Sequence, residues 1–382
     1  MTVTFSTIIN MVLFNGVAIL LLKYVIANSE IVLKIGVRVV MLLMVMILLR
    51  QFIPFELPSQ NIINITRIWP KIYIAFVKPV FAFAGTEWSP FSIMLIVSIM
   101  GSILSIVKLF ISYISLRYTV NNFEPVNDST VNRIVDEINS EYRKKVYFKV
   151  VKSNQVKSPF IFGLCRPFII LPEMNLSEDE WHYVMRHEMS HYYFKDLWIR
   201  FACEILQSLY WWNPFAYLLR KQMTKIQELR VDSTVIEKLG KLQKMEYLEC
   251  LIKVARQRSD ARRKRWVASF NSDCEENVTN RIDAIFEYTK EHKIRNSHIF
   301  KRVGFILALV IFLTPNFIIF EPYAIAKEHE EGTYEIKNTN SYLIQNDDGT
   351  YDVYVDNIHI ATVTEVFDES LKIYNKEGSE TK

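Results

Sequence analysis

Two histidines spaced four residues apart are the residues of this sequence best suited to chemistry. They lie in the pentapeptide His187-Glu188-Met189-Ser190-His191. On a helix, positions i and i+4 share one face, so both imidazoles point the same way. Such a pair supplies two of the protein ligands of a catalytic zinc ion, and the neighbouring glutamate can act as general base on a metal-bound water. Because a helix rich in His and Glu can spell this motif by chance, its context must decide.

The context predicts a helix that begins just before the motif. Ser177 and Glu180 have the spacing of a capping box. Neither Pro nor Gly interrupts the chain between Ser177 and Asn213. The alternative, two ordinary surface or core histidines, requires two coincidences on one helix face. The pattern therefore favours a metal site.

A third ligand is expected from a second helical pattern, about Phe215 to Leu239. Glu228, 37 residues after His191, offers a hard oxygen, and Asp232 one turn later could accept a hydrogen bond from a ligating imidazole. Asp196 is a weaker candidate for the same supporting role. For each acid the alternative is a solvated helix face, and the histidine pair shifts the balance towards the metal site. The oxyanion-stabilising residue is not identified by the sequence: Tyr192, Tyr193 and Tyr210 are candidates, but aromatic residues in such positions are more often packing residues.

The composition predicts a membrane protein. Half of the 382 residues are hydrophobic and 25 are Phe, which is too apolar for an ordinary soluble enzyme. The first apolar stretch lacks a basic leader and a small-residue cleavage site, so we expect it to remain as a span. Four transmembrane helices are predicted, at about residues 4–27, 37–49, 91–116 and 303–320.

The placement of Lys and Arg predicts the orientation of these spans. Residues 117–302 carry 32 Lys/Arg and 24 Asp/Glu, whereas residues 321–382 carry 5 and 14. We therefore expect residues 1–116 to hold three transmembrane helices with an extracellular loop near 52–89. Residues 117–302 would then be a cytoplasmic catalytic domain, followed by a fourth helix and an extracellular acidic tail. All four cysteines fall in the predicted cytoplasmic part, which agrees with a reducing compartment.

Strand patterns flank the helical ones. Residues 146–151 and two apolar runs within Ser158–Pro172 predict strands before the capped helix. The two runs within Ser158–Pro172 could form a core hairpin, or one of them could pair with an extended substrate. In the tail, a small β-meander is predicted, with strands Tyr342–Gln345, Tyr351–Val355 and Ile358–Val363.

The apolar, aromatic stretch Leu197–Leu219 is long enough to cross a membrane. Crossing would place His191 and Glu228 on opposite sides. A site that needs both therefore predicts a helical hairpin, bent at Asn213-Pro214, that lies at or partly in the membrane. Residues 233–265 are expected to form one polar helix that ends in a basic run.

Several of these pieces resemble one family, the β-lactam sensor-transducer (BlaR/MecR-type antirepressor) membrane zinc metallopeptidases. The matching pieces are Ser158–Pro172, Arg186–His191 with Asp196-Leu197, Trp211–Pro214, and Glu228 with Asp232. With the apolar spans, the resemblance covers roughly residues 1–320. It implies a gluzincin-type site in which His187, His191 and Glu228 hold one Zn²⁺ per chain and Glu188 is the general base.

The expected fold is a mainly α, multi-pass integral membrane protein of the cell membrane. It has four transmembrane helices, a cytoplasmic α+β gluzincin-type zinc metallopeptidase domain and a small extracellular β-rich tail. The resemblance implies regulation by proteolysis, in which an outside signal activates the zinc domain to cleave itself and remove a DNA-binding repressor. Ala268–Asn271 resembles the self-cleavage segment of the family, so the Ser269–Phe270 bond is a candidate cleavage site. An ordinary flexible linker is the alternative.

The resemblance leaves the stimulus open. The antibiotic sensors carry a large penicillin-binding domain after the fourth span, where this sequence has about 60 residues, so direct β-lactam sensing is not expected. Two other functions remain in view: a Ste24/HtpX-like maintenance or peptide-processing protease, and a non-catalytic receptor or immunity protein. The expected partners are a protein substrate such as a repressor, membrane lipid, an unknown extracellular ligand and a second copy of the chain in a homodimer. Direct binding of nucleic acid is not expected.

Overall fold

The computed structural model describes most of the chain and divides it into two compact units. The described residues are 5–52, 61–65, 69–83, 85–259, 281–286, 306, 318–322, 336, 340–346, 349–364, 366 and 371–375. One unit comprises residues 1–63 and 75–320, and the other comprises 64–74 and 321–382. The helices of the described part are α1 (Phe5–Ala27), α2 (Ser29–Ile35), α3 (Val37–Phe52), α4 (Trp69–Val77), α5 (Pro90–Asn121), α6 (Ser129–Ser140), α7 (Glu178–Tyr193), α8 (Asp196–Leu209), α9 (Pro214–Glu237) and α10 (Lys241–Ser259).

The strands are short. They are β1 (Asn61–Ile65), β2 (Phe81–Phe83), β3 (Thr86–Trp88), β4 (Glu124–Pro125), β5 (Lys149–Lys152), β6 (Phe160–Phe162), β7 (Phe168–Leu171), β8 (Ile318–Pro322), β9 (Ser341–Gln345), β10 (Tyr351–Val355), β11 (Ile358–Val363) and β12 (Lys372–Asn375).

Among the described residues, two helices are long and apolar enough to cross a membrane, α1 over Ile8–Ala27 and α5. A third crossing results if α2 and α3, which meet at a bend of 92°, form one span. These helices coincide with the first three spans predicted from the sequence. The fourth predicted span, 303–320, lies largely outside the described residues, and its last three residues belong to strand β8 rather than to a helix. The four-span arrangement and the extracellular tail therefore stay predictions.

Helix α5 continues beyond the apolar stretch and reaches the four-stranded sheet formed by β4, β5, β6 and β7. Its 32 residues correspond to about 48 Å, longer than the roughly 30 Å of a bilayer core. In its last turn, Val120 is fully buried in a cluster with Val151 and Ile170 of the sheet. One unbroken helix therefore links a predicted span to the core of the domain that follows it.

That domain contains a four-stranded sheet with the order β4-β5-β7-β6. Strand β7 lies inside the sheet, parallel to β5 and antiparallel to β6, and all four of its residues are buried. The predicted hairpin within Ser158–Pro172 is confirmed, whereas β5 starts at Lys149, three residues later than expected. Gly163 in the hairpin has a φ of 105°, and an added Cβ would lie 2.3 Å from the Arg166 carbonyl oxygen. Strand β6 is left at the edge of the sheet.

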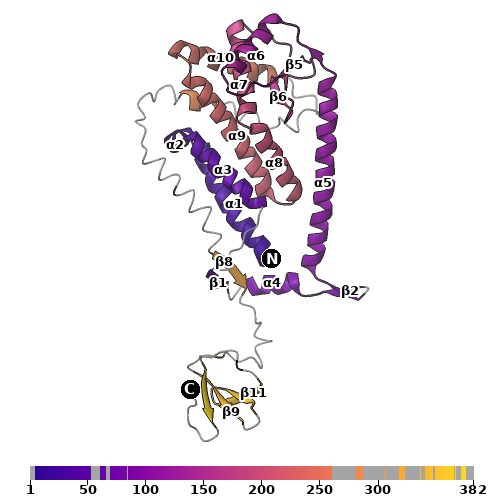
Figure 1. Ribbon diagram of the computed structural model, residues 1–382, viewed down its shortest axis with the longest axis vertical. Coiled ribbons are helices and arrows are strands. Elements are labelled where there is room, and N and C mark those ends of the chain that lie inside the picture. Colours follow the sequence, from indigo (N-terminus) through magenta and orange to yellow (C-terminus); the bar gives the residue numbers. More distant parts are fainter. Residues whose placement is uncertain are drawn as a thin grey trace. The chain divides into compact units, whose positions relative to one another are not determined.

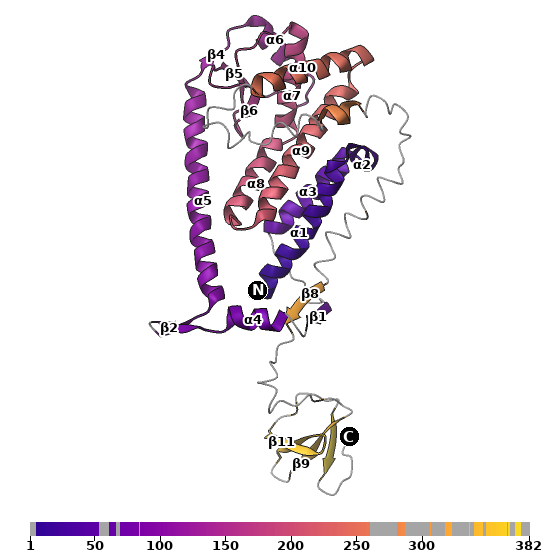
Figure 2. The same ribbon diagram turned by 180° about the vertical axis from the view of Figure 1, so that it is seen from behind.

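Helices α8 and α9 form the hairpin that the sequence predicted. Asn213 ends the turn and caps α9, because its side chain accepts the Phe215 backbone N–H at 2.9 Å, and Pro214 opens the helix. Figures 1 and 2 show the hairpin with α5 on one side and with α1 and α3 on the other. Its turn is held by α5, since the indole N–H groups of Trp212 and Trp211 donate to the Oγ and the carbonyl of Ser98 at 2.8 and 3.2 Å.

We expect Gly101→Val to loosen this contact between the hairpin and α5. A Cβ at Gly101 would lie 2.3 Å from Nε1 of Trp211, so the indole must move and give up its hydrogen bond. Overpacking of this kind costs about 1–3 kcal/mol. Unfolding in detergent, followed by tryptophan fluorescence, measures the loss. Leu104→Val on the same helix is the control, because Leu104 is 69% exposed, and equal stability of the two variants would contradict the expectation.

The polar helix expected over residues 233–265 is instead two helices. Helix α9 ends at Glu237, and α10 begins at Lys241, directly after Gly240. Glycine lowers helix stability by about 1 kcal/mol relative to alanine, which favours a break at this position. Residues 260–265, with the basic run, lie outside the described residues.

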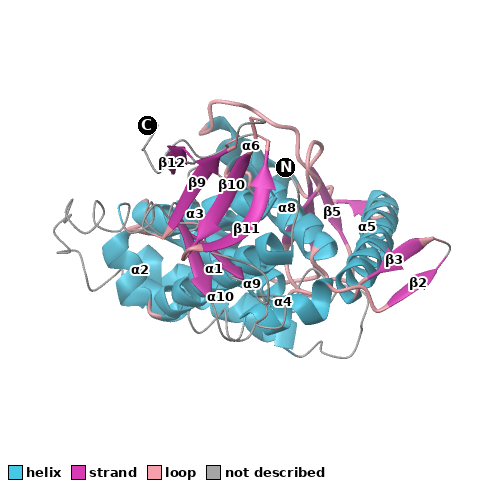
Figure 3. Cartoon of the chain, turned by 90° about the horizontal axis from the view of Figure 1, so that it is seen from below, coloured by secondary structure: helices cyan, strands magenta, loops and turns pink. Residues whose placement is uncertain are grey.

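The tail contains the predicted β-meander and one strand more. Strands β9, β10 and β11 pair in sequence, with Tyr354 opposite Tyr342. Strand β12 adds to the outer side of β9 in parallel, giving the order β11-β10-β9-β12, and Figure 3 shows these four strands side by side. Leu343, Val353 and Leu371 form the small buried core of this sheet.

Candidate metal centre

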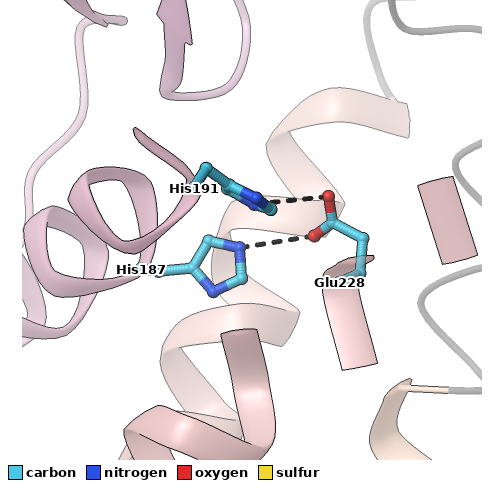
Figure 4. Close-up of side chains that lie close together, drawn as sticks. All are labelled: His187, His191 and Glu228. Carbon is cyan, nitrogen blue, oxygen red and sulfur yellow. Dashed lines mark hydrogen bonds and ion pairs between the residues drawn. The ribbon is translucent and has the colours of Figure 1, made fainter. Parts of the chain in front are cut away.

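The structure brings His187, His191 and Glu228 together. Figure 4 shows both imidazoles projecting from one helix, α7, towards the carboxylate that α9 supplies. The Nε2 atom of His187 lies 3.3 Å from Oε2 of Glu228, and that of His191 lies 3.5 Å from Oε1. A tetrahedral zinc ion with ligands at about 2.0–2.2 Å needs donor atoms about 3.4 Å apart. The three side chains therefore have the types and the spacing of a two-histidine, one-carboxylate metal site.

His187 is supported from behind by an acid and a phenol. Its Nδ1 lies 3.2 Å from Oδ1 of Asp232 and 3.0 Å from the hydroxyl of Tyr247, which itself donates to Asp232 at 2.6 Å. Such partners fix the ring and turn Nε2 towards the metal position. Burial lowers the pKa of His187, but hydrogen bonds with Asp232 and Glu228 outweigh burial and raise it to about 9. Tyr247 lies on α10, and no motif in the sequence marks it.

His191 has a supporting acid of its own. Its Nδ1 lies 2.8 Å from Oδ2 of Asp196, and both side chains are buried. On a continuous helix, a residue five positions later would lie about 140° around the axis and face elsewhere. The chain avoids this by leaving the helix at Phe194 and Lys195, where Lys195 has a φ of 65°. Asp196, the weaker candidate in the sequence, thus contacts His191 as Asp232 contacts His187.

Arginines pair with the carboxylates of this cluster. Arg230 contacts Asp196, and Arg200 donates from Nη2 to Oε1 of Glu228 at 2.9 Å. Arg281 contacts both Asp232 and Glu228. Sequence reasoning missed all three arginines, because their partners lie between 28 and 53 residues away along the chain and no local pattern relates them. Buried carboxylates without such partners would be costly.

Glu188 faces a large cavity beside the cluster. The cavity has a volume of about 770 Å³ and is lined by Glu188 together with His187, His191 and Glu228. Burial raises the pKa of the Glu188 carboxyl. A raised pKa favours the uptake of a proton by this carboxylate, as a general base requires.

The cavity extends from the cluster to strand β6 and helix α5. Phe160 and Phe162 of β6 and Tyr113 and Leu116 of α5 contribute an apolar wall. Because β6 is an edge strand, its backbone can pair with an extended peptide in this space. The hairpin thus fits both roles considered from the sequence, with β7 in the core and β6 beside the cavity.

Tyrosines close to the motif in sequence point away from it. The hydroxyl of Tyr193 donates to Asn139, and that of Tyr210 donates to the Gln51 carbonyl at 3.2 Å. Neither of these two candidates for oxyanion stabilisation lines the cavity. Ser269 and Phe270 lie outside the described residues.

We expect Asp196→Asn and Asp232→Asn each to weaken metal binding by about 10–100-fold, because each removes the charged partner of a ligand imidazole. Competition with a zinc chelator near pH 9, where the proton of His187 competes least, measures the effect. Asp136→Asn, at an exposed position on α6, is the control. A loss confined to Asp232→Asn would show that the contact between Asp196 and His191 does not support the site.

Comparison with known proteins identifies relatives of the chain. It is similar to the regulatory protein BlaR1 of Bacillus licheniformis, with 29% identity over 157 residues that make up 41% of this chain and 26% of that protein. It is also similar to the methicillin resistance mecR1 protein of Staphylococcus aureus, with 25% identity over 140 residues, 35% of this chain and 24% of the relative. The chain therefore spans about a quarter of the length of the curated relatives that it matches.

The family profile described as BlaR1 peptidase M56 matches residues 62–285, which is more than half of the chain. This stretch contains α5, the sheet, the histidine motif and Glu228. The family implies a metallopeptidase, and the apolar helices are those of a membrane protein. The resemblance seen in the sequence is confirmed: the chain belongs to the BlaR1 peptidase M56 family.

Proposed function

We propose that the protein is a membrane-embedded zinc endopeptidase in which His187, His191 and Glu228 hold one Zn²⁺. The observation that carries the proposal is that donor atoms of these three side chains all lie within 4.8 Å of one another, with the Nε2 atoms of the two imidazoles 3.3 and 3.5 Å from the two oxygens of the Glu228 carboxylate. When bound, zinc supplies a Lewis acid for the scissile carbonyl and lowers the pKa of its water. Glu188 would act as the general base that takes a proton from the attacking water and would then donate that proton to the leaving amine. Asp196 and Asp232 keep the two imidazoles oriented throughout.

The substrate in this proposal is an extended protein segment with large apolar side chains. Its backbone would pair with the edge strand β6, and its side chains would contact the apolar wall that includes Phe160, Phe162 and Tyr113. In this proposal α1 and α5 lie in the membrane, so the site is suited to substrates that reach the membrane surface.

We further propose a regulatory role, in which an external signal leads the peptidase to cleave itself, a cytosolic repressor, or both. Similarity to proteins named as regulatory and as methicillin resistance factors supports this role. Helix α5 offers a physical route for the signal, because it runs unbroken from a predicted span to the peptidase sheet. In this proposal residues 117–302 are cytoplasmic, the loop near 52–89 and the tail 321–382 are outside, and the Ser269–Phe270 bond is the self-cleavage site.

The proposal is tested by comparing cells that express the wild type with cells that express Glu188→Ala. We expect a small set of proteolytic fragments, including one from a DNA-binding repressor and one from the peptidase itself, to disappear in the variant. Terminal sequencing of the missing fragments identifies the cleaved bonds. Fragments from many unrelated membrane proteins would instead indicate a maintenance protease of the Ste24/HtpX kind. Identical fragments in both cells, with no zinc in the purified wild type, would indicate a non-catalytic receptor.

A further inference from the structure

Arg281 touches three members of the candidate metal centre at once. Its guanidinium contacts Asp232 through two nitrogen atoms, Nε to Oδ2 at 2.6 Å and Nη2 to Oδ1 at 2.8 Å. Nη1 lies 3.2 Å from Oε2 of Glu228, and Nη2 lies 3.5 Å from Nε2 of His187. The two latter atoms are proposed metal donors, and Asp232 is the acid behind one of them. Arg281 thus connects the proposed ligand Glu228 to Asp232, the acid that supports the other proposed ligand, His187.

The segment that carries Arg281 is anchored elsewhere as well. Residues 281–286 are helical, and Ala284 packs into the apolar cluster that includes Val32 of α2 and Leu229 of α9. Ile285 packs into a second cluster, which includes Tyr247 of α10. A displacement of this segment would therefore carry the guanidinium away from the carboxylates that it bridges.

The other two arginines of the centre differ from Arg281 in where they originate. Arg230 lies on α9 and Arg200 on α8, the helices that also supply the carboxylates Glu228 and Asp196. Their contacts are fixed by the hairpin itself. Arg281 comes from a separate segment, so its contact adds a restraint that the hairpin alone does not provide.

We propose that Arg281 is a positioning residue of the metal centre, and that it makes metal affinity depend on the placement of segment 281–286. The planar guanidinium meets one carboxylate with two parallel N–H groups and still reaches a second carboxylate, a geometry that a lysine ammonium does not reproduce. Without it, the carboxylates of Asp232 and Glu228 lose the cation that bridges them. The inference rests on the metal site of the proposed function.

The test measures zinc affinity of the full-length protein in detergent by competition with a chelator, at one fixed pH. We expect Arg281→Gln and Arg281→Lys each to weaken binding by about 10–100-fold, the range found when partners of metal ligands are removed. Arg133→Gln, which removes a surface ion pair with Glu178, is the control. Wild-type affinity in Arg281→Gln, or full rescue by Arg281→Lys, would overturn the proposal, the latter by showing that charge alone suffices.

A double variant separates positioning from general stability. Because Arg281 acts through Asp232, the loss in Arg281→Gln with Asp232→Asn should be smaller than the product of the two single losses. Independent, multiplying effects would overturn the proposal. The proposal would also be overturned if Arg281→Gln lowered the thermal midpoint of the metal-free protein but left its zinc affinity unchanged. That result is what a merely structural role of Arg281 predicts.

A third variant moves the segment without touching Arg281. Ala284→Leu overfills the cluster beside Leu229, and we expect it to weaken zinc binding when Arg281 is present and to add nothing in Arg281→Gln. Ala18→Leu overfills the same cluster from α1 and is the matched control for general destabilisation. Should the wild type fail to bind zinc, the proposed function itself fails. Should the wild type bind zinc and His187→Ala abolish binding while the Arg281 and Ala284 variants bind normally, only this inference fails.

Discussion

Replacing Glu188 with Gln will lower the rate of peptide cleavage by about 10²–10⁴-fold and leave zinc bound. Glu188 lies outside the donor set of His187, His191 and Glu228, so its charge can be removed without removing a ligand. The amide keeps the size of the side chain but accepts no proton. Because the lost step occurs in the transition state, we expect kcat to fall while KM changes little.

The measurement uses purified full-length protein, a fluorogenic peptide with large apolar residues around the cleaved bond, and zinc content per chain. Glu137→Gln is the control, since Glu137 lies on α6 in an exposed ion pair with Arg133. A Glu188→Gln enzyme within tenfold of the wild-type rate would exclude the base role. Loss of zinc from the variant would show instead that Glu188 stabilises the site.

Features determined within a few residues were predictable from the sequence. The capping box of Ser177 and Glu180 starts α7 where expected, and Asn213-Pro214 bends the α8–α9 hairpin. The strands of Ser158–Pro172 and of the tail follow their turn residues closely. In each case the signal and the structure that it produces lie within one turn of chain, so tertiary contacts are not needed to choose the conformation.

Features that depend on tertiary contacts were not predictable. Lys195 has no local reason to adopt a left-handed conformation, and the break there is stabilised by the buried hydrogen bond between His191 and Asp196. Strand β12 pairs in parallel with β9, across an intervening hairpin, and its short run gives no turn signal of its own.

The metal centre shows the same division. The histidine motif and Glu228 were found because helical spacing relates residues on one face, and helix α9 was already expected to carry an acid pair. Tyr247 and Arg281 reach the same cluster from α10 and from the segment 281–286. Their positions in the sequence have no fixed relation to the motif, so only the packing of those elements against α7 and α9 reveals them.

Zinc binding will be strongly pH-dependent, because the metal must displace a proton from His187. In the metal-free site, burial lowers the pKa of this imidazole, yet hydrogen bonds with Asp232 and Glu228 raise it from 6.5 to about 9. At pH 7 the metal-free imidazole is therefore protonated, whereas a ligand must be neutral. Well below pH 9 each unit of pH should lower the apparent affinity about tenfold, and because the imidazole is half protonated at pH 9 the change between pH 9 and pH 7 is about 50-fold.

The same shift predicts opposite effects of pH on the two forms of the protein. A raised pKa stabilises the metal-free fold fully below 6.5, and this contribution is lost as pH rises towards 9. The stabilisation by zinc grows over that interval, because affinity for the folded state increases. Between pH 6.5 and 9, the thermal midpoint of the metal-free protein should therefore fall. At a fixed concentration of free zinc, the difference between the thermal midpoints with and without zinc should grow over the same interval.

Calorimetry in two buffers of different ionisation heat tests the proton count directly, and we expect about one proton released from His187 per zinc bound near pH 7. Asp232→Asn is the informative variant, because removal of the acid lowers the pKa of His187 towards 6.5. Its affinity should change less between pH 7 and 9 than that of the wild type, so that its deficit is largest at pH 9. A wild-type affinity that is flat over this interval would mean that His187 is already neutral in the metal-free chain, and that its contact with Asp232 orients the ring without holding a proton.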